Sequence, residues 1–226
     1  MTGEGALRDR LGMVRGGIAN AAREAGRDAA EITLIVVTKF HPAGLVRQLH
    51  ALGVSDFGEN RHQEAQAKAT ALADLDLTWH FIGQLQSKKA RQVRAYARVI
   101  HSLDRESVVD ALASTESTVD CFIQLNLTDD EARGGVRDAE LESLTDRILA
   151  TSGLRLLGVM AVAPVDEEPR AAFARVRAAS ERVKRLAPDA GFISAGMSGD
   201  YREAILEGAT HLRIGSAITG NRPTPG

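Results

Sequence analysis

The sequence predicts a single domain, residues 1–226, folded as a (β/α)8 TIM barrel with an extra N-terminal helix. Two observations lead to this fold class. Short apolar runs alternate with longer amphipathic stretches, and repeated strand–helix units force neighbouring strands to pair in parallel. The chain contains eight such runs, enough to close a barrel in which no strand edge stays exposed.

The elements are expected in a regular order. An N-terminal helix covers roughly residues 4–26, where Leu7, Leu11 and Val14 recur at helical spacing. Strands follow at 32–38, 54–57, 78–82, 98–101, 119–125, 154–160, 191–195 and 211–215. Crossover helices are expected between them at 43–52, 61–73, 104–113, 138–151 and 167–187. The run "SKKARQVR" is expected to form the solvated face of a further helix.

Composition and charge argue against several classes of protein. Of the residues, 44% are hydrophobic and 26% are charged, as in ordinary globular chains. The formal net charge of -2 provides no basic field for nucleic acid. Cys121 is the only cysteine and lies in an apolar run, so we expect a core position and no internal disulfide. Without a signal h-region or a bilayer-spanning apolar stretch, the protein is expected to be cytoplasmic, with no membrane anchor.

A lysine stands at the end of the first predicted strand. In "ITLIVVTKFHP", Lys39 follows Ile35 and Val37 on one face of the strand, at the C-terminal mouth of the barrel. A charged ammonium there is costly unless it is paired, exposed or chemically used. Arg213 and Gly215 share a row in the eighth strand, which barrel closure makes the neighbour of the first. Lys39 and Arg213 are therefore expected in one mouth, where two cations favour an anionic ligand.

Phosphate is the natural candidate, because loops seven and eight of such barrels commonly bind it. After the seventh strand, in "SAGMSGDYREAILEG", Gly196 permits close backbone approach, Ser198 is expected to cap a helix, and Gly208 to end it. After the eighth, "RIGSAITGN" offers the N–H groups of Gly215 and Ser216 beside a hydroxyl.

A lysine beside a phosphate site suggests imine chemistry with an aldehyde or ketone. Pyridoxal 5'-phosphate carries both an aldehyde and a phosphate. On these features alone, a Lys39 that merely extends its amine into solvent is an equal alternative.

Seven ordered segments carry a resemblance: "VVTKFHP", "GVSDFGENRHQE", "WHFIGQLQSKK", "IHSLDR", "GVMAVAP", "SAGMSGDYREAI" and "HLRIGSAITGNR". Together they resemble the pyridoxal phosphate homeostasis protein family, from about residue 7 to residue 222. The resemblance implies a monomeric or weakly associating barrel related to the N-terminal domain of alanine racemase. It also implies a carrier that takes part in intracellular vitamin B6 homeostasis, with apo-enzymes that receive the cofactor as partners.

The resemblance also assigns site residues. Lys39 falls on the position that forms the internal aldimine with pyridoxal phosphate. Arg213 matches the arginine that faces the pyridine nitrogen, and Asn60, in "FGEN", matches a pocket asparagine. The phosphate contacts match three residues: Ser198, Gly215 and Ser216. Ser216 stands where the family usually has threonine and keeps the hydroxyl, whereas Thr219 stands where it usually has phenylalanine and loses an aromatic ring.

Three functions stay open: a carrier with little or no turnover, a small amino-acid racemase or lyase that uses the same aldimine, and a cofactor-free Schiff-base aldolase. The ordered segments favour the carrier over the aldolase. A racemase of this relationship would call for a second, β-rich domain and a tyrosine opposite the lysine. The chain ends at Gly226 and has only Tyr96 and Tyr201, of which Tyr201 is expected to pack against the barrel. We therefore expect a non-catalytic carrier.

Other features are less specific. The segment 126–137, "NLTDDEARGGVR", is either a mobile flap over the mouth or a solvated loop. The histidines show no compact ligand spacing, so no metal site is expected. His80 and His101 end the third and fourth predicted strands and either line the mouth or are hydrogen-bonded structural residues.

Overall fold

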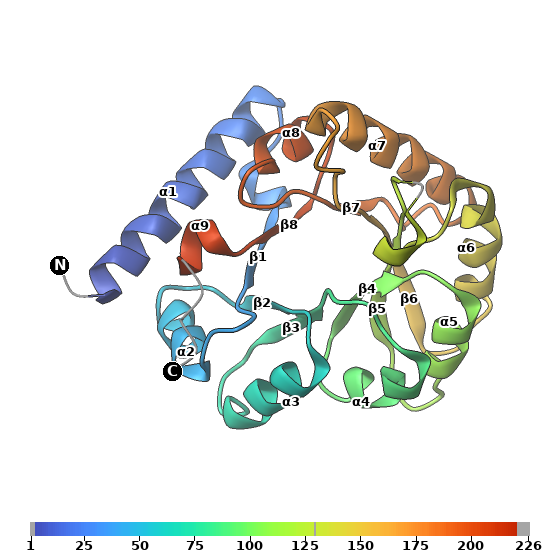
Figure 1. Cartoon of the computed structure of the whole chain (residues 1–226), viewed down its shortest axis with the longest axis horizontal. Coiled ribbons are helices and arrows are strands. Elements are labelled where there is room, and N and C mark those ends of the chain that lie inside the picture. The colour runs from blue at the N-terminus through green and yellow to red at the C-terminus, as the bar shows by residue number, and fades with distance from the viewer. Residues whose placement is uncertain (1–2, 129, 221–226) are drawn as a thin grey trace.

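Eight parallel strands close into a barrel in the computed structural model, which describes residues 3–128 and 130–220 (Figure 1). The strands follow chain order: β1 (Thr33–Val37), β2 (Asp56–Glu59), β3 (Thr78–Phe81), β4 (Val99–Leu103), β5 (Val119–Gln124), β6 (Leu154–Met160), β7 (Phe192–Ser194) and β8 (His211–Ile214). β8 pairs with β1, and Ile35 lies opposite Arg213. The predicted TIM barrel is confirmed, and the C-terminal strand ends meet at one mouth.

Helices surround the barrel. The α-helices are α1 (Gly3–Glu24), α2 (Ala43–Ala51), α3 (His62–Ala71), α4 (Ala90–Arg94), α5 (Glu106–Leu112), α6 (Leu141–Leu149), α7 (Pro169–Leu186), α8 (Tyr201–Leu206) and α9 (Ser216–Thr219). Short 3-10 turns are η1 (Ala29–Glu31), η2 (Ser87–Lys89), η3 (Glu131–Arg133) and η4 (Asp138–Glu140). The "SKKARQVR" run forms η2 and α4, so the helix expected there is confirmed. In the described part of the chain, no helix has the length and apolar character to cross a membrane.

The extra N-terminal helix lies outside the barrel beside α8 and α9 (Figure 1). Leu7, Leu11 and Val14 are buried, as their spacing predicts. Tyr201 begins α8 and places its hydroxyl against α1, so that a Cβ on Gly17 would lie 2.1 Å from Tyr201 Oη. The expected packing role of Tyr201 is confirmed, although the surface that its hydroxyl meets is α1.

The prediction is least accurate at β2, which was expected at 54–57 and occupies Asp56–Glu59. Gly53, with a φ of 78°, still belongs to the turn after α2, and Val54 N donates to Leu49 O within that turn. Strand pairing begins only where Asp56 lies opposite Thr78 of β3. The shift brings Glu59 to the C-terminal end of β2.

Apolar side chains fill the space between the strands and the helices, and Phe57, Leu49 and Phe173 are among the fully buried ones. Cys121 is buried in this layer, as predicted, and burial raises the pKa of its thiol. In the barrel interior, β1 and β2 pack closely at a glycine. A Cβ on Gly58 would lie 3.1 Å from Ile35 Cγ2, so the backbone of β2 approaches the side chains of β1 closely.

Candidate functional site

A cavity of about 560 Å³ opens at the C-terminal mouth of the barrel. This volume lies in the range of small-molecule sites. The site residues predicted from the sequence all line it: Lys39, Asn60, Ser198, Arg213, Gly215 and Ser216. They come from the ends of β1, β2 and β8 and from the loop after β7, so barrel closure brings together residues that are far apart in the chain.

Lys39 lies two residues beyond the end of β1, on the row that continues from Val37 into the cavity. Its Nζ lies 6.0 Å from the centroid of the Phe40 ring. Among the described residues, Nζ makes no hydrogen bond and no ion pair. A half-buried ammonium with free donors can receive a ligand without first breaking a bond within the protein.

Arg213 is 4% exposed and closes the floor of the cavity. Its Nη1 donates to Ser194 Oγ at 2.5 Å, and its Nη2 donates to the carbonyl oxygen of Ala161 at 2.8 Å. Burial lowers the pKa of the guanidinium to about 10, with Asp200 acting in the opposite direction. The group therefore stays charged at neutral pH, and N–H donors remain for a ligand, because a guanidinium has about five in all.

Below the pocket, hydrogen bonds run through the barrel interior. Ser194 Oγ lies 2.9 Å from His101 Nδ1, His101 Nε2 lies 2.9 Å from His80 Nδ1, and His80 Nε2 lies 3.0 Å from Asp56 Oδ1. Because Arg213 already donates to Ser194, the Ser194 hydroxyl can donate to His101. With this direction, His101 Nε2 donates to His80 Nδ1, and His80 Nε2 donates to Asp56 Oδ1. Burial lowers the pKa of His101 well below its usual value, which agrees with a neutral ring.

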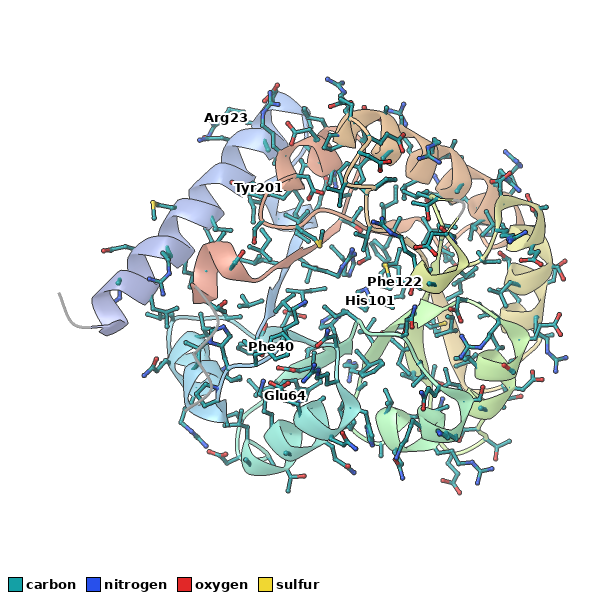
Figure 2. The ribbon with its side chains drawn as sticks, viewed as in Figure 1. Arg23, Phe40, Glu64, His101, Phe122 and Tyr201 are labelled. Carbon is teal, nitrogen blue, oxygen red and sulfur yellow. The ribbon has the colours of Figure 1, made fainter. Side chains whose placement is uncertain are left out.

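These two histidines lie within their strands and not at the strand ends, where they were expected. Neither is among the described residues that line the cavity, so the structural alternative is confirmed. The His101 ring also stacks on Phe122, with 4.7 Å between centroids, and Figure 2 shows this pair inside the barrel. The alternation of residues along a strand did not predict whether these two side chains point into the barrel or towards the helices, because both faces of these strands are buried.

The loops after β7 and β8 meet at two serines. Ser216 Oγ donates to Ser198 Oγ at 3.4 Å, and Ala217 N donates to the same Ser198 oxygen at 3.3 Å. The N–H groups of Ser198 and Ser216 make no hydrogen bond to another described residue. Hydroxyls and N–H groups that converge in this way suit a phosphate.

The expectation that Ser198 caps a helix is wrong. α8 begins at Tyr201, and Asp200 is its N-cap residue, whose carboxylate accepts from Met197 N at 2.6 Å. Gly196, with a φ of 94°, turns the chain here, and Ser198 Oγ accepts from Ala217 N of α9. Gly208 does follow the end of α8, with a φ of 95°.

Asn60 lies directly beyond β2 and is positioned by a close approach of two backbones. A Cβ on Gly83 would lie 2.1 Å from the Asn60 carbonyl oxygen, so only glycine fits there. Asn60 Oδ1 is buried without a hydrogen-bond partner in the described structure. A buried acceptor of this kind is costly unless a donor, such as one from a ligand, reaches it.

Several pocket residues were not singled out from the sequence, and one of them, His41, has a titratable side chain. His41 lines the cavity, and burial, followed by the charge of Lys68, lowers the pKa of its imidazole. Its place in "KFHP", two residues after Lys39, was the available signal. The two tyrosines lie elsewhere: Tyr201 contacts α1, and Tyr96 Oη lies 3.4 Å from His62 Nδ1. The described residues of the 126–137 loop do not line the cavity either.

Comparison with known proteins agrees with this geometry. Residues 12–223 match the family model "Alanine racemase, N-terminal domain". A pyridoxal phosphate homeostasis protein of Corynebacterium glutamicum is 40% identical over 211 residues, which cover 88% of this chain and 95% of the relative. One from Pseudomonas aeruginosa is 38% identical over 96% of each chain. The solved structure of PipY from Synechococcus elongatus with PLP bound has a TM-score of 0.83 and 32% identity, covering 95% of this chain and 100% of that one.

Proposed function

Because the chain belongs to the family of pyridoxal phosphate homeostasis proteins, built on the N-terminal domain of alanine racemase, we propose that it binds pyridoxal 5'-phosphate at the barrel mouth. In this proposal Lys39 is the Schiff-base lysine, and the protein holds and delivers the cofactor within intracellular vitamin B6 homeostasis. One observation carries the proposal: a lysine without a hydrogen-bond or ion-pair partner among the described residues, a buried arginine and two loop hydroxyls converge on one cavity.

The residues present fit the chemical groups of the cofactor. Ser198, Ser216 and the backbone at Gly215 offer hydroxyl and N–H donors to the phosphate. Arg213 offers a donor to the pyridine nitrogen. Asn60 Oδ1 is a buried acceptor without a partner in the described structure. A hydroxyl group of the ligand can donate to it and so satisfy it.

The cofactor supplies an aldehyde for covalent attachment and a ring that can accept electrons. Lys39 would contribute the nucleophile for that attachment, through the neutral form of its amine at Nζ. Arg213 keeps its own proton, so the nitrogen that it faces stays a hydrogen-bond acceptor. An unprotonated ring is the poorer electron sink, which suits a carrier better than a catalyst.

The proposed role is non-catalytic. Racemisation needs an acid–base group on each face of the reacting carbon. Neither tyrosine reaches the cavity, and His41 lies only two residues from Lys39. We propose that the protein acts as a monomer in the cytoplasm and that its partners are apo-enzymes that receive the cofactor.

Absorption spectroscopy tests the proposal directly. The protein mixed with pyridoxal phosphate should show the visible band of a protonated imine, and Lys39→Ala should abolish it. Borohydride reduction followed by peptide mapping should place the pyridoxyl group on Lys39. A pyridoxyl group on another lysine, or a band that persists in Lys39→Ala, would contradict the assignment.

A further inference from the structure

The "FGENRHQE" segment contains two carboxylates, Glu59 and Glu64, that the proposed function does not use. Glu59 ends β2, Glu64 lies in the first turn of α3, and Lys68 of α3 joins them. Lys68 is 5% exposed and Glu59 is 1% exposed. We define these three residues, Glu59, Glu64 and Lys68, as the acid–lysine cluster.

Each N–H donor of the Lys68 ammonium has a partner within the protein. Nζ donates to Glu59 Oε1 at 2.6 Å, to Glu64 Oε1 at 2.8 Å and to the carbonyl oxygen of Thr38 at 2.8 Å. Glu59 Oε1 also accepts from Thr38 Oγ1 at 2.7 Å. Thr38, the residue before Lys39, is thus held through its backbone and its side chain.

The residue after Lys39 is held by the same cluster. Phe40 N donates to Glu64 Oε1 at 2.6 Å, and Figure 2 shows Phe40 and Glu64 close to each other between the barrel mouth and α3. Consequently the acid–lysine cluster binds one backbone atom on each side of Lys39. Among the described residues, Lys39 makes no hydrogen bond and no ion pair with the cluster.

Phe40 also has a backbone conformation that is costly for its residue type. Its φ is 68°, and it is the one non-glycine residue with a positive φ in the described chain. Such a conformation is costly for a residue with a side chain and persists only when surrounding contacts hold it. The hydrogen bond from Phe40 N to Glu64 is a contact of this kind, and the Arg61 guanidinium lies 4.7 Å from the centroid of the Phe40 ring.

Fold stability alone explains this cluster poorly. Desolvation of buried ion pairs largely offsets their attraction, so apolar residues of similar size often stabilise a fold as well or better. Glu59 Oε2 has no hydrogen-bond partner within the described residues, which adds a further cost. A fixed backbone at 38–40 is what these contacts achieve.

We propose that Glu59, Lys68 and Glu64 are positioning residues that hold the backbone on both sides of Lys39, so that its amine points into the cavity at the place where the cofactor aldehyde must lie. This inference rests on the proposed function, because it assumes that Lys39 is the attachment point. Misplacement of a reacting group by about 1 Å can cost roughly 100-fold, so a rigid backbone has a large effect on covalent capture.

The test compares two ligands that differ only in whether they can react with Lys39. Pyridoxal 5'-phosphate has an aldehyde, whereas pyridoxine 5'-phosphate has an alcohol in its place and binds only through ring and phosphate. Glu64→Ala removes the acceptor for Phe40 N. We expect this variant to bind pyridoxal phosphate about ten-fold or more weakly and to form the imine band more slowly, with unchanged affinity for pyridoxine phosphate.

Two matched variants separate position from general damage. Glu64→Gln keeps an oxygen that accepts from Phe40 N and should restore most of the affinity for pyridoxal phosphate. Gln63→Ala, on the neighbouring exposed position of α3, should behave as wild type. Thr38→Val removes the hydroxyl bonded to Glu59 and provides a second test that keeps the Glu64 contacts, with a smaller loss in the same direction.

The outcomes distinguish this inference from the proposed function. If wild-type protein bound both ligands alike and formed no imine band, the proposed function itself would fail. If Lys39→Ala lost the preference for pyridoxal phosphate and Glu64→Ala kept it, only the positioning inference would be overturned. Equal weakening of both ligands in Glu64→Ala, or a Glu64→Gln variant as impaired as Glu64→Ala, would also overturn it.

Discussion

Lys39 and Lys68 lie on opposite sides of the same short backbone segment, and their surroundings differ completely. Lys68 is 5% exposed, and all its donors are used by two carboxylates and the Thr38 carbonyl oxygen. Lys39 is half-buried, and its amine has no hydrogen-bond or ion-pair partner in the part of the chain that the structure describes. Burial alone therefore does not identify a reactive lysine. A lysine whose donors are satisfied holds structure together, and one left unsatisfied on a fixed backbone is available to a ligand.

Lys39 would be a catalytic residue, and not only an attachment point, if a second acid or base in the cavity acted with it. We expect cofactor-loaded protein to exchange the Cα hydrogen of L-alanine at a negligible rate, because a missing acid–base group costs about 10²–10⁴-fold. Deuterium exchange in D₂O, followed by NMR, measures this rate. Lys39→Ala and His41→Ala are the controls. Exchange or D-alanine formation at enzymatic turnover, lost in both variants, would favour the racemase and assign His41 the second role.

Stability measurements on variants of Lys68 and Lys39 compare the structural roles of the two lysines without any cofactor. Lys68→Met leaves Glu59 buried with no cation, and breaking a buried pair in this way typically lowers the free energy of unfolding by about 3–5 kcal/mol. Lys39→Ala removes no hydrogen bond or ion pair between residues that the structure describes, so we expect a change within about 0.5 kcal/mol in the free energy of unfolding. Denaturant unfolding of both variants gives the two values. Comparable losses would mean that the two lysines play similar structural parts.

The phosphate contacts decide whether Lys39 receives its ligand at all. Ser198→Ala removes a hydroxyl that bridges the two loops, and losing a hydrogen bond to a charged group costs about 1.5–3 kcal/mol. Affinity for pyridoxal phosphate should therefore fall about ten-fold or more. Pyridoxal, which has no phosphate, should bind weakly to the wild-type protein and to Ser198→Ala, with the same affinity for both. Ser87→Ala, at η2 and outside the cavity lining, is the control; unchanged affinity in Ser198→Ala would remove Ser198 from the site.

Acid conditions test two regions at once, because the barrel interior and the acid–lysine cluster change the stability of the fold with opposite sign as pH falls. Burial, with nearby His80, lowers the pKa of His211 from 6.5 to about 4. The unfolded chain therefore binds this proton first, and stability is lost as pH falls from 6.5 towards 4. Burial raises the pKa of Glu59, with Lys68 opposing, so protonation of Glu59 favours the folded state as pH falls.

We expect the histidines to dominate, since His101 acts in the same direction as His211. Each unit of pKa difference is worth about 1.4 kcal/mol, so the loss should be on the order of a few kcal/mol. Unfolding curves across this pH range measure it, and His211→Asn should flatten the dependence. A protein that gains stability on acidification would show that Glu59 decides the response.

The sequence by itself determined the barrel and the meeting of Lys39 with Arg213. Alternating strands and helices leave little choice of topology, and closure places the eighth strand beside the first. The Gly- and Ser-rich loops at those strand ends then lie at one mouth whatever the side-chain details. The family resemblance added the cofactor and assigned Asn60, which periodicity alone does not mark.

Only the tertiary structure decided which polar side chains meet. The Thr38–Glu59 bond joins residues 21 positions apart, and the His101–Ser194 bond joins residues 93 positions apart. Strand periodicity gives the face of a residue but not its partner across the barrel, because both faces of a parallel strand are buried. For the same reason the sequence expected Ser198 as a helix cap, whereas its oxygen bonds the loop after β8. Lys68 reaches its three acceptors because α3 packs against β2 and β3, whereas Lys39 lines the cavity and its amine has no partner among the described residues.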